Sequence, residues 1–206
     1  MLVDRVERLH VYKWNRKPAK VKVLSTLLYY FGLSYRVVAL ALRGESRFSY
    51  ESVRLWYRRL QVALPKPTPK RRSILAIDET KLKLAGDQLY LWAAIDVYDK
   101  EVLAVRISWQ RNSIDAELFL QDVLRTCTNK PLILVDKGPW YPYALNQMGL
   151  KYRHVTFGLR NRIERWFGYL KERTERFHNN FPYHSTPQSI DTYLHSFIGW
   201  YHILKT

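Results

Sequence analysis

Residues 73–84 read Ser73-Ile-Leu-Ala-Ile-Asp-Glu-Thr-Lys-Leu-Lys-Leu84, and this stretch begins the part of the chain that determines the fold. Apolar and polar residues alternate along much of it, which is typical of a β-strand. The turn residues 85–87 follow. Two further strand candidates, Leu89–Val97 and Val102–Ser108, are joined by residues 98–100. Three consecutive strands with such short connections predict an antiparallel meander.

Downstream of the meander, helix and strand patterns alternate. The predicted elements are a helix capped by Ser113 or Asp115 and running to about Thr126, a buried parallel strand Pro131–Asp136, a short helix Pro142–Met148, a strand Lys151–Phe157, a helix Arg160–Arg173 and an aromatic helix Tyr193–Leu204. The resulting order, β-β-β-α-β-α-β-α, is that of the ribonuclease H-like fold. We therefore expect an α/β domain with a mixed five-stranded sheet.

The front of the chain is helical. Helices are predicted over residues 21–31, 35–43 (capped by Ser34) and 50–61 (capped by Ser49). The last two resemble a helix-turn-helix, in which the second helix places Arg54, Arg58 and Arg59 opposite its apolar side. An ordinary αα-hairpin fits the same pattern.

Residues 63–72, Ala63-Leu-Pro-Lys-Pro-Thr-Pro-Lys-Arg-Arg72, separate these two regions. Alternating prolines prevent a helix or a central strand, so the segment predicts an extended linker. The expected organisation is a helix-turn-helix domain over residues 1–62, the linker over 63–72 and a ribonuclease H-like domain over 73–206.

Charge points to a polyanionic partner. The chain carries a formal net charge of +16, and residues 1–72 hold 17 Lys/Arg against 4 Asp/Glu, a net +13. Such a field favours nucleic acid or an anionic membrane surface, although a highly charged soluble protein has a similar composition. No apolar run has transmembrane length, no signal peptide is visible, and the single cysteine excludes an internal disulfide. We expect a cytoplasmic, nucleoid-associated protein with no membrane partner.

Three acids lie at informative positions. Asp78 is in the first strand, Asp136 ends the fourth, and Glu164 is in the first turns of the helix from Arg160 to Arg173. In a sheet of this type the fourth strand lies beside the first, which would place the three carboxylates together. Clustered carboxylates repel one another unless a cation joins them, and Mg²⁺ prefers such oxygen ligands. The pattern predicts a metal site for phosphoryl transfer.

Each acid also has a structural interpretation. Asp78 could be an exposed residue on a polar strand face. Asp136 could be a turn residue near Gly and Pro. Glu164 could complete a capping box with Asn161.

Three segments together resemble a known family: Ala76-Ile-Asp-Glu-Thr80, Leu134-Val-Asp-Lys-Gly-Pro-Trp-Tyr141 and Thr156-Phe-Gly-Leu-Arg-Asn-Arg-Ile-Glu-Arg165. They resemble the DDE transposases of bacterial and archaeal insertion sequences, especially archaeal members of the integrase-like subgroup called insertion-sequence family six. The resemblance covers essentially the whole chain. One departure is the spacing from Asp136 to Glu164, which at 28 residues is shorter than in the best-known relatives.

The resemblance implies that Asp78, Asp136 and Glu164 form the catalytic, metal-binding triad, with Mg²⁺ or Mn²⁺ as cofactor. It implies 3′-end cleavage at terminal inverted repeats, strand transfer into target DNA, and a homodimer or larger assembly. The residues expected to bind DNA are Lys171, Arg165, Asn161, Arg54, Arg58, Arg59, Lys70, Arg71 and Arg72. Two alternatives remain: a ribonuclease H-like nuclease that does not join DNA, and an inactive transposase remnant that acts as a repressor.

Overall fold

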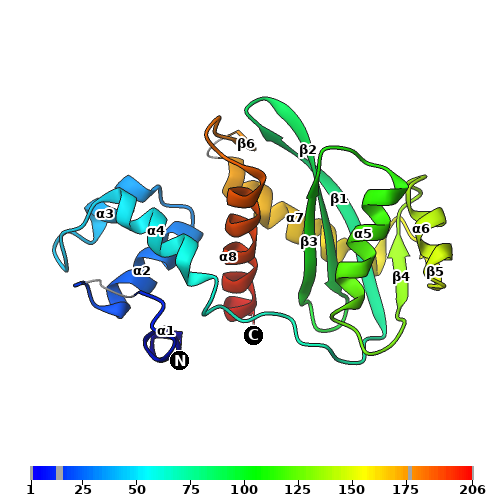
Figure 1. Cartoon of the computed structure of the whole chain (residues 1–206), viewed down its shortest axis with the longest axis horizontal. Helices are drawn as coiled ribbons and strands as arrows, with labels where there is room; N and C mark the ends of the chain where they lie inside the picture. The colour runs from blue at the N-terminus through cyan, green and yellow to red at the C-terminus, as the bar shows by residue number, and fades with distance from the viewer. Residues whose placement is uncertain (1, 13–15, 176–177, 206) are drawn as a thin grey trace. The chain divides into compact units, whose positions relative to one another are not determined.

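The computed structural model describes residues 2–12, 16–175 and 178–205. The chain divides into two compact units, one formed by residues 1–66 and 188–206 and the other by residues 67–187. Figure 1 shows the elements of both units along the chain. We describe each unit by itself.

The second unit contains a mixed sheet in the order β3-β2-β1-β4-β5, with β6 paired to β1 off this path. The meander β1–β2–β3 is antiparallel, and β4 and β5 add in parallel beside β1, as the sequence predicts. The strands are β1 (Ile74–Leu84), β2 (Asp87–Asp96), β3 (Val102–Ser108), β4 (Leu132–Val135), β5 (Tyr152–His154) and β6 (Asn180–Phe181). The prediction of five strands missed β6, which has only two residues and therefore no detectable alternation.

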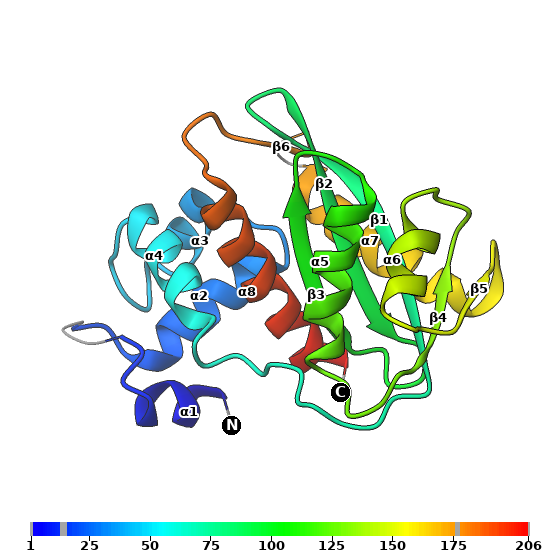
Figure 2. The same cartoon turned by 45° about the vertical axis from the view of Figure 1, so that its right-hand side comes forward.

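Helices cover both faces of this sheet. Helices α5 (Ser113–Leu124) and α6 (Tyr141–Gln147) lie on one face, and α7 (Asn161–Thr174) lies on the other (Figure 1, Figure 2). Leu75 and Ile77 of β1 pack into the core under α5 and α6. The architecture is that of a ribonuclease H-like domain, as expected. The helix cap differs from both predictions, because Asn112 accepts the Asp115 amide at 2.9 Å and so begins α5.

The register of β1 with β4 sets the position of two acids. Ala76 of β1 lies opposite Leu134 of β4, and the two strands run parallel. Asp78 lies two residues after Ala76, and Asp136 lies two residues after Leu134. This register brings the two acids near each other, but Asp136 lies beyond the last residue of β4, so strand alternation does not fix the side to which its carboxylate points.

The first unit is helical. It contains α1 (Leu2–Arg8), α2 (Ala19–Tyr30), α3 (Tyr35–Ala41), α4 (Tyr50–Leu60) and most of α8 (Pro187–Lys205). The predicted caps are confirmed: Ser34 accepts from the Val37 amide and Ser49 from the Ser52 amide. Helix α1, which the pattern did not predict, packs Val6 into this unit's core.

Helix α8 belongs to the front unit, which differs from the predicted catalytic domain over residues 73–206. Trp200 of α8 packs in one cluster with Trp56 and Leu60 of α4. Ser196 Oγ also donates to the Tyr57 carbonyl at 3.1 Å. The C-terminal helix therefore packs against residues far earlier in the sequence, such as Tyr57, which is 139 residues before Ser196, and local patterns do not reveal such long-range pairing.

The predicted linker over residues 63–72 is shorter than expected. At its start, Ala63 and Leu64 are buried in the core of the front unit. At its end, the Lys70 backbone pairs with residues 126–128, and the Arg72 side chain is buried. In the part of the chain that the structure describes, no helix is both long and apolar enough to cross a membrane.

Candidate active site

Asp78 is a buried acid on the α7 side of β1. Asp78 is 9% exposed, and one of its carboxylate oxygens lies 2.8 Å from a guanidinium nitrogen of Arg160. Burial raises the pKa of Asp78 to about 6, although the Arg160 guanidinium acts in the opposite direction. The interpretation of Asp78 as an exposed strand residue is therefore wrong.

Asp136 follows the last residue of β4 and is held by the turn after it. The Gly138 amide donates to Asp136 Oδ1 at 2.8 Å, and the Asp136 backbone oxygen lies 2.7 Å from His154 Nδ1. The other carboxylate oxygen is 3.9 Å from an Arg160 nitrogen. Asp136 thus has the turn role that its Lys-Gly-Pro context suggests, and it also faces the Asp78 site.

Glu164 lies in the first turn of α7, with about half of its side chain exposed. Its Oε1 is 3.1 Å from an Arg160 nitrogen. The capping-box interpretation is wrong: in the described chain Asn161 is already helical, Arg160 occupies the N-cap position, and no side chain caps this end. The Glu164 carboxylate is free of a capping role and turns toward Arg160.

The three predicted acids therefore meet at a single guanidinium, that of Arg160. Sequence reasoning did not single out this residue. Its spacing of four residues before Glu164 is the only local signal, since side chains at i and i+4 share a helix face. Its contacts with Asp78 and Asp136 depend on the sheet.

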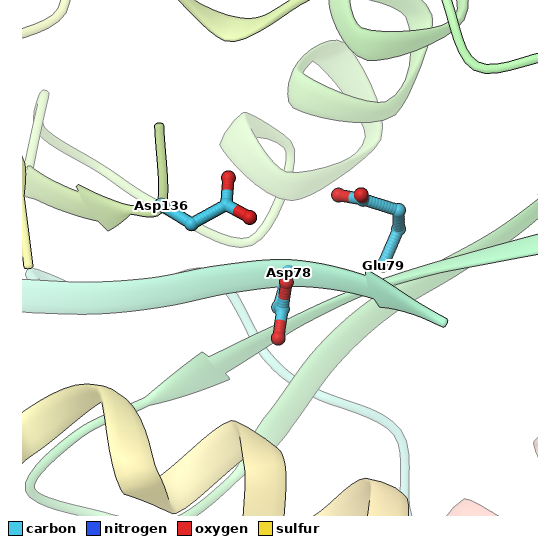
Figure 3. A group of neighbouring side chains, drawn as sticks. All are labelled: Asp78, Glu79 and Asp136. Atoms are coloured by element: carbon cyan, nitrogen blue, oxygen red, sulfur yellow. The ribbon is translucent and has the colours of Figure 1, made fainter. Parts of the chain in front are cut away.

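Glu79, the neighbour of Asp78, points to the other face of β1. Figure 3 shows the Glu79 and Asp136 carboxylates directed toward one another, with Asp78 on the opposite side of the strand. The Tyr141 hydroxyl donates to Glu79 at 2.5 Å, and Arg111 pairs with it at 3.1 Å. Burial raises the pKa of Glu79. One ligand oxygen from each of Asp78, Glu79 and Asp136 lies within 4.8 Å of the others, so oxygen donors for a cation converge here.

The predicted DNA contacts on α7 lie in solvent. Asn161, Arg165 and Lys171 are exposed. Their spacing places Asn161 and Lys171 on the same stripe of the helix as Glu164. A polyanion bound beside the acids would meet this stripe.

The remaining predicted DNA contacts differ in their surroundings. On α4, Arg59 is exposed and Arg58 half-buried, while Arg54 pairs with Glu51 one turn earlier. Arg71 is exposed, and Lys70 lies 2.7 Å from Asp99.

Arg72 has a structural position instead. Its buried guanidinium lies 3.1 Å from Asp96 and 2.9 Å from Glu101, and it donates to the Thr126 and Thr68 carbonyls. These partners occupy its donors within the unit, so we remove Arg72 from the expected DNA contacts.

Comparison with known protein families shows which family the chain belongs to. The model of the DDE domain family DDE_Tnp_IS240 matches residues 73–197. The chain belongs to this family of DDE transposase domains. It is also 44% identical over 206 residues to the uncharacterized protein MJ0017 of Methanocaldococcus jannaschii, covering all of this chain and 96% of that protein. A second relative, the uncharacterized protein aq_aa24 of Aquifex aeolicus, is 39% identical over 59 residues, which are 29% of this chain and 49% of that protein.

The similar solved structures include integrase catalytic core domains and an intasome. The catalytic core domain of BIV integrase matches with a TM-score of 0.46 at 13% identity, over 61% of this chain and 80% of that one. The simian T-cell lymphotropic virus intasome in complex with PP2A regulatory subunit B56 gamma matches with a TM-score of 0.45 at 16% identity, over 74% and 60% of the two chains. The HTLV-2 integrase catalytic core domain in complex with magnesium matches with a TM-score of 0.42 at 18% identity, over 55% and 73%. Membership of the DDE family assigns a transposase-type function to this chain.

Proposed function

We propose that this chain is an active DNA transposase, which cleaves 3′ ends at terminal inverted repeats and transfers them into target DNA. One observation carries the proposal: in a chain of the DDE family, Asp78, Asp136 and Glu164 all lie near the guanidinium of Arg160. Three acids from a strand, a strand end and a helix are costly to bring together without a positive charge. Their shared position therefore suggests a site built to hold cations.

The donor set fits a hard divalent cation. Carboxylate oxygens are the ligands that Mg²⁺ and Mn²⁺ prefer, and the oxygens of Asp78 and Asp136 already lie within 4.8 Å of each other. We propose that Asp78, Asp136 and Glu164 hold the metal. Bound Mg²⁺ supplies positive charge to the attacking and leaving oxygens of phosphoryl transfer. The protein's own contribution is to position DNA, water and the 3′-hydroxyl against these acids.

DNA binding is proposed for two surfaces. On α7, Asn161, Arg165 and Lys171 would contact the DNA end beside Glu164. On the front unit, Arg58 and Arg59 of α4 would contact the terminal repeat, in the manner of a helix-turn-helix. The net charge of +13 over residues 1–72 supports this second surface. Because two DNA ends must be joined, we propose a homodimer or larger assembly as the active form.

The decisive experiment compares Asp78→Asn with the wild type. Asparagine keeps the size of the side chain but removes the charge needed to hold a metal. The substrate is a supercoiled plasmid that carries the DNA flanking the coding sequence, incubated with Mg²⁺ or Mn²⁺. We expect nicking and end joining to fall to the level of a metal-free control, while a gel shift with the same DNA is unchanged.

Asp87→Asn is the matched control, because it makes the same chemical change at an exposed position at the start of β2. Full activity in Asp78→Asn would contradict the proposed mechanism. Nicking without joining by the wild type would indicate a nuclease. Specific DNA binding with no nicking would indicate a DNA-binding remnant.

A further inference from the structure

Arg160 occupies an unusual position for an arginine. Its side chain is only 9% exposed, and its two terminal nitrogens reach three carboxylates that come from different elements. One nitrogen lies 2.8 Å from Asp78 and 3.9 Å from Asp136. The other lies 3.1 Å from Glu164. The guanidinium therefore spans the group of acids for which we propose metal binding.

The backbone before α7 delivers this side chain. Residues 158–160 form a single 3-10 turn that continues into α7. Gly158 begins the turn at φ +82°, where an L side chain would be strained. The turn points Arg160 into the protein, while Phe157 and Leu159 beside it are exposed.

The charge balance of the site explains why a positively charged side chain lies among the three acids. A buried charge is costly unless it is paired, and buried carboxylates that lie close together repel. Burial disfavours the charged guanidinium of Arg160, and the ion pairs with Asp78, Asp136 and Glu164 offset this cost. Among the described residues, the buried Arg160 Nε finds no acceptor. The guanidinium is thus held by the acids rather than by a full set of hydrogen bonds.

We propose that Arg160 is a built-in counter-cation, which keeps Asp78, Asp136 and Glu164 together without metal and competes with a divalent metal for their oxygens. The inference rests on the proposed function, since it takes these acids as the metal ligands. A guanidinium at 2.8 Å from Asp78 and a divalent ion on the same carboxylate repel each other. Metal binding therefore requires Arg160 to leave at least part of this arrangement.

The test measures metal binding without DNA and without catalysis. Mn²⁺ is titrated into the full chain at pH 7.5 and followed by calorimetry, with thermal unfolding in EDTA and in Mn²⁺ alongside. In Arg160→Gln we expect Mn²⁺ to bind at least tenfold more tightly than in the wild type. We also expect a lower Tm in EDTA and a larger rise in Tm on adding Mn²⁺.

Two further variants serve as controls for the position and the shape of the Arg160 charge. Arg162→Gln removes the same charge from the same helix, two residues away, and should bind Mn²⁺ as the wild type does. Arg160→Lys keeps the charge but not the planar fork that reaches several carboxylates, so its affinity should fall between wild type and Arg160→Gln.

The possible failures separate this inference from the proposed function. Equal or weaker Mn²⁺ binding by Arg160→Gln, with binding lost in Asp78→Asn, would overturn the role of Arg160 and leave the metal site intact. A lack of saturable Mn²⁺ binding in both the wild type and Arg160→Gln would overturn both proposals. If Arg160→Gln does not fold, Arg160→Lys carries the test. Wild-type Mn²⁺ affinity in that variant, combined with wild-type Tm in EDTA, would contradict competition through the contacts of the guanidinium with the three acids.

Discussion

Two glycines inside helices allow a quantitative test of the structure, because they have opposite surroundings. Gly168 lies in the middle of α7 on an exposed face, and a Cβ built on it meets nothing within 4 Å. Gly199 lies in α8, where a Cβ would be 2.4 Å from the Leu64 Cβ. Glycine in a helix interior costs about 0.5–1 kcal/mol relative to alanine. Gly168→Ala should therefore raise the free energy of unfolding by about 0.5–1 kcal/mol.

For a chain of this length, such a gain raises Tm by about 1–4 °C. Gly199→Ala makes the same substitution but inserts a methyl group into a packed site, which should lower the free energy of unfolding by roughly 1–3 kcal/mol. Thermal and urea unfolding of both variants measure the two effects. A fall in Tm for Gly168→Ala would refute the reasoning, because it would mean that α7 packs against something at this position. Strand transfer by the Gly168→Ala variant should be measured as well. It reports whether DNA contacts the exposed stripe of α7 that includes Lys171, a proposed DNA contact.

Two other predictions concern charged groups. Arg72→Ala removes the ion-pair partner of the buried Asp96, which keeps only its bonds to the Tyr98 and Asp99 amides. Urea unfolding should therefore show a loss of about 3–5 kcal/mol, whereas Arg71→Ala should cost less than about 0.5 kcal/mol. Conversely, only the Arg71 variant should reduce the salt dependence of DNA binding, and equal stability of the two variants would contradict the buried pair. In EDTA, Asp78 is protonated more readily in the folded chain (pKa about 6) than when unfolded, so its contribution of about 3 kcal/mol is present at low pH and lost as pH rises from about 4 to 6. The Tm difference between wild type and Asp78→Asn, measured against pH, should change by several degrees over that window, and a flat difference would show that Asp78 is not buried in this way.

The fold was largely predictable from sequence because its signals are local. Alternation, turn residues and capping serines define the meander and the front helices, and these predictions agree with the structure to within a few residues. Of the two omissions, β6 has only two residues, too few for a period to appear, and α1, although as long as α3, has no capping serine before it in the sequence. Helix α8 was predicted as a helix but not as part of the front unit, because its partners Trp56 and Leu60 are distant in sequence.

For the candidate site, the sequence could predict that certain acids come near one another. The Asp78 and Asp136 carboxylates lie close because β4 pairs with β1, and Glu164 lies at the start of α7 beside Arg160. Arg160 and Arg72 show the limit. Both are basic residues beside predicted functional segments, yet both are buried in ion pairs with acids from other elements. Sequence alone does not separate an arginine that binds DNA from one that balances buried carboxylates, because the difference lies in the tertiary partners.

Strand geometry also decides which of two adjacent acids belongs with Glu164. Proximity alone groups Asp78, Glu79 and Asp136, but Glu79 lies on the opposite face of β1 from α7. The Asp136 carboxylate is directed toward Glu79, yet one of its oxygens lies 3.9 Å from an Arg160 nitrogen. Its oxygens are already engaged by the Tyr141 hydroxyl and by Arg111. Asp78 faces α7 and shares Arg160 with Glu164. A cation that takes the place of Arg160 would therefore meet Asp78, Asp136 and Glu164, and reaching Glu79 would require breaking two bonds that anchor it under α6. We therefore propose Asp78, Asp136 and Glu164 as the ligand set, while Glu79 stays bound to Tyr141 and Arg111.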